Sequence, residues 1–373
     1  MPPIDLTTIM SPNVFIFKLY GFWKPDTILS FLLKVLVLCI LLTFLVSYAV
    51  LTFSMNLVKL AFMYKNIHKI LEMMALLKTE PFRTKCREHE DLAQSTKKYY
   101  SSVFYFCLVL GLTVDLFWGI YPVTSVESII PFRAWFPFNY EDTVYFNVIY
   151  ALQTAAATMN TVICLNLDCF SSSMLVQAGL QCDMMSITLK NLEKFMVNED
   201  GELLEAKVKD ENKQEYSNRL LKNLIYCIKH HVEIKKWAKD LEDLHFISVF
   251  LLFGVGSLVL CTSLFEISVV NPVSMEFGML LAYSSAILTE LYLYCWFGNE
   301  LIYKSTQVFD SICESPWLDC DVKFKKTIVM FLMGARKPIV VYVGGLFTMS
   351  LPVYVTILRS SYSYFTLLRN VYN

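Results

Sequence analysis

The chain has 373 residues, of which 55% are hydrophobic and only 17% are charged, and its mean hydropathy is +0.48. Soluble domains carry about 25% charged residues, so this composition excludes an ordinary soluble domain. The net charge of −1 and the absence of a basic stripe also exclude a nucleic-acid-binding protein.

Long apolar runs predict an all-α membrane protein, because lipid leaves no partner for unpaired backbone groups and the runs are too long for barrel strands. The first run is too long for one crossing, so we expect it to hold two helices joined by a tight turn near Ala49 to Ser54. This gives seven spans after a cytosolic N-terminal segment, residues 1–27, in which no cleavable signal is expected. The runs cover residues 28–63, 100–121, 143–168, 246–269, 277–299 and 350–371.

The positions of Lys and Arg set the orientation. Residues 64–99 hold eight of these bases, residues 176–244 hold eleven, and residues 301–338 hold six. Residues 122–142 hold only one, and residues 269–276 hold none. The loops after spans two, four and six are therefore predicted to be cytosolic, with the N-terminus inside and the C-terminus outside.

The basic segments keep a helical apolar pattern. Residues 28–300 are predicted to hold the first six spans. Within this region, we interpret residues 64–99 and 169–245 as helical extensions of the spans that pack together in the cytosol. Solvated helical stalks are the alternative, but they would leave many apolar side chains exposed. Residues 196–215 are highly charged and predict a mobile loop. We expect a further anchor helix and connection in residues 301–345, and a seventh helix in residues 346–373.

Acidic residues inside the apolar runs are costly unless they are paired or hydrated. Asp115 and Glu290 could each bind a ligand amine or a neighbouring Tyr, and a pairing between helices is the favoured interpretation. Asp168 and Glu300 fall near cytosolic ends, where a Lys partner is readily available. The eleven cysteines lie mostly in apolar or cytosolic segments, which favours reduced thiols over disulfides.

The last helix carries a stripe at three- and four-residue spacing. From periodicity alone, this stripe could pack against a neighbouring subunit or face a pore. It consists of Ile357, Ser360, Tyr364, Leu367 and Val371.

Several blocks, in order, resemble the insect odorant receptor family. They are FRAWFPF (132–138), IKHHVEIKKWAKDLEDLHF (228–246), YCWFGNEL (294–301), the final hairpin and helix (325–363) and SYSYFTLLRN (361–370). The resemblance implies a ligand-gated, non-selective cation channel of four subunits whose pore is made by the last helix. It implies that Leu367 and Val371 form the apolar gate. It also implies a tuning subunit, because the segment between spans four and five lacks the co-receptor's insertion. Such a subunit assembles with a shared co-receptor in a heterotetramer, in the plasma membrane of a sensory neuron dendrite.

The same resemblance places a small volatile ligand in the outer half of the bundle, between spans two, three, four and six. Aromatic rings there would favour flat or aromatic ligands, and each residue could instead serve ordinary helix packing. The candidates are Phe53, Gly111, Val114, Trp118, Tyr145, Tyr150, Thr154, Phe277, Leu280 and Tyr283.

A seven-helix G-protein-coupled chemoreceptor is the second candidate, although its loops would need the opposite distribution of charge. A membrane enzyme is disfavoured because the five histidines are scattered and no phosphate-binding loop or metal-spaced cluster is present in the sequence. We expect no catalytic residue, cofactor or metal.

Overall fold

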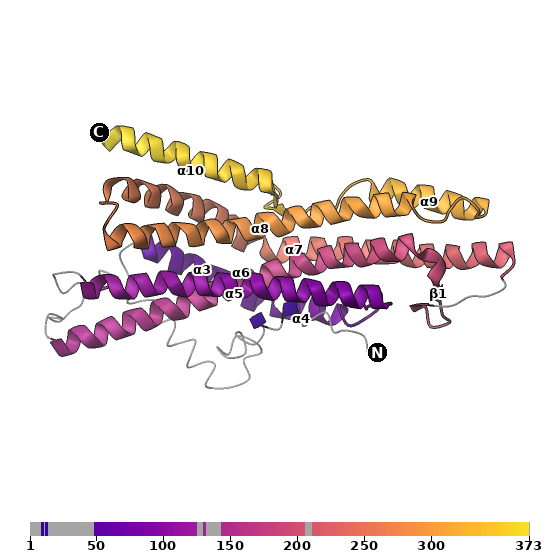
Figure 1. The fold of residues 1–373 in the computed structure, drawn as a ribbon, viewed down its shortest axis with the longest axis horizontal. Coiled ribbons are helices and arrows are strands. Elements are labelled where there is room, and N and C mark those ends of the chain that lie inside the picture. The colour runs from indigo at the N-terminus through magenta and orange to yellow at the C-terminus, as the bar shows by residue number, and fades with distance from the viewer. Residues whose placement is uncertain are drawn as a thin grey trace.

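The computed structural model describes residues 9–10, 12–13, 48–124, 130–131, 143–205 and 211–372. Within these residues the chain is a bundle of long helices that run along one axis (Figure 1). The helices are α3 (Tyr48–Lys65), α4 (Ile67–Leu76), α5 (Arg87–Thr124), α6 (Thr143–Lys190), α7 (Lys213–Val269), α8 (Met275–Cys313), α9 (Val322–Ala335) and α10 (Leu351–Tyr372).

Two ends of the bundle can be distinguished. We call outer the end where α5 finishes, α6 and α8 begin and α10 finishes, and inner the end that holds α9 and β1. The 57 residues of α7 span roughly 85 Å, more than twice the thickness of a bilayer core. Since one crossing uses about 20 residues, the inner half of the bundle extends far beyond a membrane.

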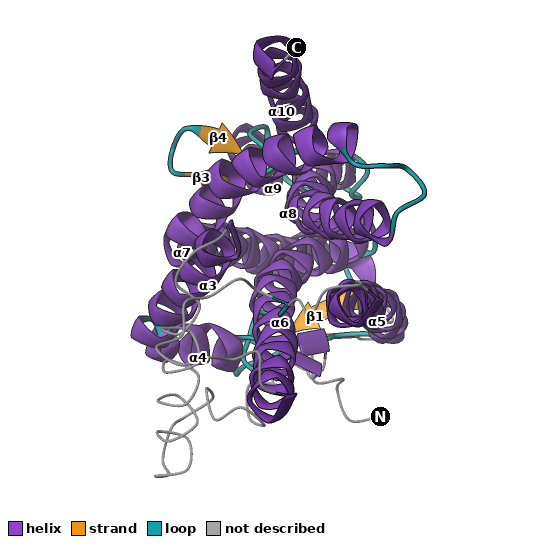
Figure 2. Cartoon of the chain, turned by 90° about the vertical axis from the view of Figure 1, so that its left-hand side faces the viewer, coloured by secondary structure: helices purple, strands orange, loops and turns teal. Residues whose placement is uncertain are grey.

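Helix α6 lies at the centre of the bundle, where it contacts α3, α5, α7 and α8 (Figure 2). Every residue from 166 to 182 is buried, so this stretch of α6 is covered on all sides. Toward the outer end many α6 side chains are exposed. The densest packing of the molecule therefore lies in its inner half.

Side-chain caps fix where the long helices begin. Asn212 forms a capping box at the start of α7: its Oδ1 accepts from the backbone N of Gln214 and Glu215, and Glu215 accepts from the Asn212 backbone N. Ser274 caps α8 by accepting from the backbone N of Phe277 at 3.1 Å.

The predicted extensions are confirmed as helices. The residues after span two form the end of α3 and then α4, those after span four continue α6 to Lys190, and α7 begins at Lys213 and continues into span five. Within the described residues, α5, α6, α7 and α8 are long and apolar enough to cross a membrane.

Two expectations about local structure were wrong. The turn predicted near Ala49 to Ser54 lies inside α3, which is already helical at Tyr48; the residues between 14 and 47, where the first span is expected, lie outside the described part. The predicted loop 196–215 begins with an antiparallel hairpin, β1 (Phe195–Val197) with β2 (Leu203–Glu205). The hairpin forms because Gly201 takes a positive φ of 82° in its turn, and because Phe195 and Leu203 are buried.

A second short hairpin joins the inner half to the last helix. Strands β3 (Tyr342–Val343) and β4 (Phe347–Thr348) pair across Gly344 and Gly345, whose φ angles are 68° and 66°. The loop between the paired residues Val343 and Phe347 has three residues, and both glycines sit in the left-handed region that few other residues adopt. The hairpin turns the chain from α9 back into α10, which packs on α7 and α8.

Candidate functional site

A cavity of about 150 Å³ lies between α3, α5, α6 and α8 in the outer half of the bundle. It is smaller than the sites that take drug-sized molecules, roughly 300–1,000 Å³, so it suits a small ligand. The cavity is lined by Thr52, Phe53, Met55, Asn56, Gly111, Val114, Trp118, Ala157, Asn160, Thr161, Cys164, Leu165, Tyr283, Ala286, Ile287 and Glu290.

Two aromatic rings stand at the outer side of this cavity. Trp118 of α5 and Tyr283 of α8 meet edge to face, with ring centroids 6.4 Å apart and an interplanar angle of 74°. This is a favourable geometry for an aromatic pair, and it leaves ring surface for a ligand to pack against. The pair also joins two helices that both wall the cavity.

Close approach of α5 and α6 shapes the middle of the cavity. A Cβ added at Gly111 would lie 2.4 Å from Cδ1 of Leu165 and 3.1 Å from Cγ2 of Thr161. Glycine at this position therefore leaves room for the Leu165 and Thr161 side chains between the two helices. A larger residue would push Leu165 and Thr161, which both line the cavity, out of place.

The inner end of the cavity is polar. Lys59 of α3 is fully buried and its Nζ lies 2.9 Å from both carboxylate oxygens of Asp168 and 2.8 Å from Oε1 of Glu290. The hydroxyl of Tyr294 also donates to Asp168, at 2.8 Å. The favoured prediction that Glu290 pairs between helices, and that Asp168 has a Lys partner, is confirmed by this cluster. Asp115 of α5 also pairs between helices, because it accepts from Oγ1 of Thr161 of α6 at 2.9 Å.

The cluster also contains three atoms that could ligate a metal. Ligand atoms of Cys164, Asp168 and Glu290 lie within 4.8 Å of one another. The Lys59 ammonium already sits against both carboxylates, and a buried ammonium and a metal ion would repel each other. We therefore interpret this group as an ion-pair cluster.

The predicted ligand-binding residues fall into three groups. Phe53, Gly111, Val114, Trp118 and Tyr283 line the cavity. Tyr150 and Thr154 line a separate open groove between α5 and α6, of about 450 Å³, where the Tyr150 hydroxyl donates to the carbonyl of Gly119.

The third group lines neither space. Tyr145 is exposed near the outer start of α6, Leu280 is buried, and the backbone N of Phe277 donates to the Ser274 cap. The cavity wall also contains Asn56, Asn160 and Cys164, which were not predicted from the sequence. Asn56 and Asn160 are polar residues within apolar runs, and this is the signal that could have identified them.

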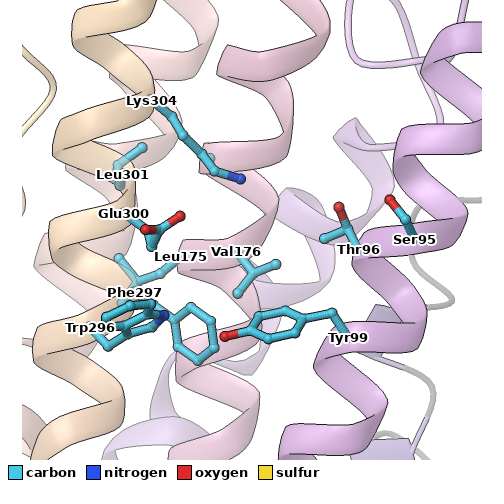
Figure 3. Close-up of a pocket in the computed structure, with 11 residues that line it drawn as sticks. Ser95, Thr96, Tyr99, Leu175, Val176, Trp296, Phe297, Glu300, Leu301 and Lys304 are labelled. Carbon is cyan, nitrogen blue, oxygen red and sulfur yellow. The ribbon is translucent and has the colours of Figure 1, made fainter.

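A larger, more open groove of about 400 Å³ lies farther toward the inner end, between α5, α6 and α8 (Figure 3). Tyr99 extends across it toward Phe297 and Trp296, and its ring meets that of Phe297 edge to face at 6.4 Å. Lys304, at its far end, pairs with Asp183 at 2.6 Å. An exposed Tyr ring and a charged pair beside it are typical of the membrane–water boundary, so this groove is a weaker candidate for a volatile apolar ligand.

The last helix, α10, presents one face to the bundle and one to the outside. Val353, Tyr354 and Ile357 pack against the core, and Ser361 is buried, with its hydroxyl donating to the carbonyl of Ser257 at 3.4 Å. Tyr364 is 60% exposed and Leu367 is 62% exposed, and Ser360 is exposed as well. The predicted stripe thus starts at a packed residue and continues onto the open face, while the side chain of Val371 lies outside the described part.

Helix α8 connects the cavity to α10. It carries Tyr283, Ile287 and Glu290 in the cavity wall. A short distance along the same helix, Tyr292 meets Tyr354 of α10 edge to face, with ring centroids 5.6 Å apart. At the inner end of α10, a Cβ added to Gly298 of α8 would lie only 2.3 Å from the carbonyl O of Met349, so the two segments are in direct contact.

Comparison with known proteins gives one family. The family described as 7tm Odorant receptor matches residues 40–362. Odorant receptor Or2 of Anopheles gambiae is 34% identical over 154 residues, covering 41% of this chain and 40% of that protein. Odorant receptor 30a of Drosophila melanogaster is 25% identical over 273 residues, covering 71% and 66%. The aligned parts thus span between two fifths and two thirds of these relatives.

Solved structures agree on the fold. The olfactory receptor OR5 from Machilis hrabei, solved in complex with eugenol, matches with a TM-score of 0.79 over 98% of each chain, at 14% identity. A second structure of the same receptor matches with a TM-score of 0.78. The chain therefore has the helical seven-transmembrane fold of these receptors, as the sequence predicted.

Proposed function

The chain belongs to the 7tm odorant receptor family, and from this membership we propose that it is a subunit of an odorant-gated, non-selective cation channel. The family consists of membrane receptors, so the protein is a receptor and not an enzyme. In the proposal, a small volatile ligand enters the cavity between α3, α5, α6 and α8 and opens a pore lined by α10.

One observation carries the proposal: the cavity and the last helix share α8. Glu290 lines the cavity and Tyr292, two residues later, contacts Tyr354 of α10. A ligand that changes the position or tilt of α8 therefore changes the support of α10. Contacts of this kind offer a route by which an occupied cavity can bias the position of α10.

The exposed face of α10 supports its assignment to the pore. Tyr364 and Leu367 are large and uncovered, although the opposite face packs on α7 and α8. In a tetramer this face would be turned to neighbouring subunits and to the axis. An apolar ring containing Leu367 and Val371 would then close the outer mouth by excluding water, and a small widening would admit ions.

Gating would follow from a shift between two arrangements of the same subunits. A ligand favours the open arrangement by as much as its affinity for the two arrangements differs. The chain between α9 and α10 contains Pro338 and the Gly344–Gly345 turn, and the hairpin is tied to the inner half because the backbone N of Tyr342 donates to Glu242 of α7 at 3.2 Å. The inner half would thus stay fixed while α10 moves about its start.

The partners follow from the same family. The chain would be a tuning subunit that forms a heterotetramer with a shared co-receptor, in the plasma membrane of a sensory neuron dendrite. The olfactory receptor OR5 of the same fold was solved in complex with eugenol, which supports a small aromatic ligand.

Recording from cells tests the proposal against a G-protein-coupled chemoreceptor. The chain is expressed with and without a co-receptor, and odour-evoked current is recorded while G-protein signalling is blocked. We expect a rapid cation current that persists under the block. A response that disappears completely with the block would support the G-protein-coupled alternative instead.

A further inference from the structure

The cavity wall holds one acid and no cation. Among the described residues that line the cavity, none is Lys, Arg or His, and the one acidic side chain is Glu290 at the inner end. Asn56 and Asn160 line the same cavity. Asn56 and Glu290 therefore offer acceptor oxygens to whatever occupies it.

Charge in the adjoining cluster is unbalanced. One ammonium, that of Lys59, faces two carboxylates, those of Asp168 and Glu290. Asp168 is the better served, since it accepts from Lys59 through both oxygens, from the Tyr294 hydroxyl at 2.8 Å and from the Cys164 thiol at 3.4 Å. Glu290 accepts from Lys59 through Oε1 alone, with the Cys164 thiol at 3.9 Å. The less compensated carboxylate is the one that lines the cavity.

Asn56 adds an acceptor that has no partner. Its Nδ2 donates to Oδ1 of Asn160 at 3.3 Å, while its Oδ1 is buried without a hydrogen bond, and the residue is only 5% exposed. Asn56 stands three residues before Lys59 on α3, so both lie on the same face of that helix. A buried acceptor without a donor is unfavourable, and a donor on the ligand would relieve that cost.

The remaining wall is apolar and aromatic. Phe53, Val114, Ile287 and the Trp118–Tyr283 pair surround the space beyond the polar end. A matching ligand is therefore a small apolar or aromatic body with one polar end that donates hydrogen bonds toward Asn56 and Glu290.

We propose that this cavity selects small ligands whose polar end is a hydrogen-bond donor, with protonated amines preferred over alcohols and phenols, and with ethers, esters and carboxylates disfavoured. The inference rests on the proposed function, because it names the chemistry of the ligand that opens the channel. An amine places a positive charge beside the less compensated carboxylate, a hydroxyl supplies a donor without charge, and an ether supplies no donor for Asn56 Oδ1. A carboxylate would also find no cation in this wall.

Matched sets of compounds test the proposal in cells that express the chain with a co-receptor. Each set keeps one skeleton (hexyl, cyclohexylmethyl, benzyl or phenethyl) and varies the polar end as amine, alcohol, methyl ether and carboxylate. In the sets that evoke current, we expect the amine to be the most potent and the ether and carboxylate to be about ten- to a hundredfold weaker than the donors. Equal potencies, or ethers that exceed amines, would overturn the inference and leave the channel intact. Silence of every set in a receptor that reaches the cell surface would overturn both.

Three variants connect the preference to the named side chains. Glu290→Gln should reduce the advantage of the amine over the alcohol about tenfold. Asn56→Leu leaves the Lys59 cluster unchanged and should weaken both donors about tenfold without weakening the ether. Asp115→Asn makes the same acid-to-amide change as Glu290→Gln on a carboxylate that lines the separate groove between α5 and α6, and it should leave the order of potencies unchanged.

Surface expression and the current without ligand are measured for each variant. A variant that fails to fold is recognised by the loss of both. If the preference for donors survives in both Glu290→Gln and Asn56→Leu at normal surface expression, these residues do not select the ligand and the proposal is overturned.

Discussion

The inner and outer halves of this receptor are built differently. In the inner half, α6 is buried on all sides from residue 166 to 182; it packs against α5, α7 and α8, and α9 packs on α7 and α8. In the outer half, the same helix exposes many apolar side chains and borders both a cavity and an open groove. One sequence of helices therefore forms a dense body at one end and a loosely filled bundle at the other.

This difference indicates a division of labour. The inner half is stabilised by contacts within the chain, so we expect substitutions there to change folding and assembly. The outer half has space for lipid, a neighbouring subunit or a ligand, so we expect substitutions there to change the response. Segments that move in allosteric proteins come from the less stable end of the structure, in agreement with this arrangement.

Two tryptophans, one in each half, test the comparison with the same substitution. Trp237 is buried in the inner half, where its Nε1 donates to the carbonyl of Met174 at 3.3 Å, and Trp118 is half-buried at the cavity. Trp237→Ala should lower the free energy of unfolding by about 3–5 kcal/mol, because it leaves a cavity in a packed core. Trp118→Ala should cost about 1 kcal/mol and weaken the ligand response about tenfold.

Thermal unfolding in nanodiscs and dose–response curves in cells measure the two effects. Val232→Ala, at an exposed site on the same helix as Trp237, is the control and should change stability by less than about 0.5 kcal/mol. The comparison fails if Trp118→Ala unfolds the receptor as severely as Trp237→Ala does.

The Lys59 cluster lies where the two halves meet, and its loss should also be large. Lys59→Met leaves Asp168 and Glu290 buried without a cation, which costs about 3–5 kcal/mol in comparable pairs. Adding Asp168→Asn and Glu290→Gln to the same chain removes the uncompensated charges and should restore most of the stability. A single Lys59→Met variant that melts like the parent would show that the cluster does not contribute to stability.

Acidic pH should weaken the inner half more than the outer half. Burial, aided by the charge of Lys85, lowers the pKa of His89 to about 4 and that of His230 to about 3. Both are therefore neutral in the fold: Nδ1 of His89 accepts from the Lys85 backbone N at 3.3 Å, and Nε2 of His230 lies 2.9 Å from Oε1 of Gln181.

Because the pKa of each His is lower in the fold than in the unfolded chain, stability is complete above about pH 6.5 and falls as the pH drops toward 4. At pH 5 each histidine should cost about 2 kcal/mol. Melting temperatures in nanodiscs between pH 8 and pH 5 measure the loss, and His230→Gln should reduce the slope by about a quarter, because burial also lowers the pKa of His231 and that of His245 to about 4. A melting temperature that is independent of pH over this range would contradict the assignment of neutral, buried histidines.

The sequence predicted the long helices well because their apolar periodicity continues beyond the membrane length. The extensions that became α4, the inner part of α6 and the start of α7 keep buried residues such as Leu224 and Ile70 at helical spacing. The same reasoning found Phe53, Trp118 and Tyr283 in the cavity wall, since aromatic residues in the outer halves of spans are visible in the sequence.

The cluster and the polar wall could be predicted only in part. Glu290 and Asp168 were recognised as acids that need partners, but Lys59 comes from a helix more than one hundred residues away, and only the rotation of α3 about its axis turns it inward. The same rotation of α3 places Asn56 in the cavity wall, which the sequence alone does not show. The hairpin at β1 and β2 was missed because Phe195 and Leu203 are two buried residues in a segment whose charge is typical of a loop.

The central claim is that a ligand in the outer cavity opens a pore lined by α10, and Leu367→Cys tests it most directly. A charged, water-soluble thiol reagent applied during recording should block the current of this variant, and the block should be faster while ligand is present. Val109→Cys, on the exposed apolar side of α5, serves as the control and should be unaffected. Ligand-evoked current that is unchanged by complete modification of Leu367→Cys would contradict the claim.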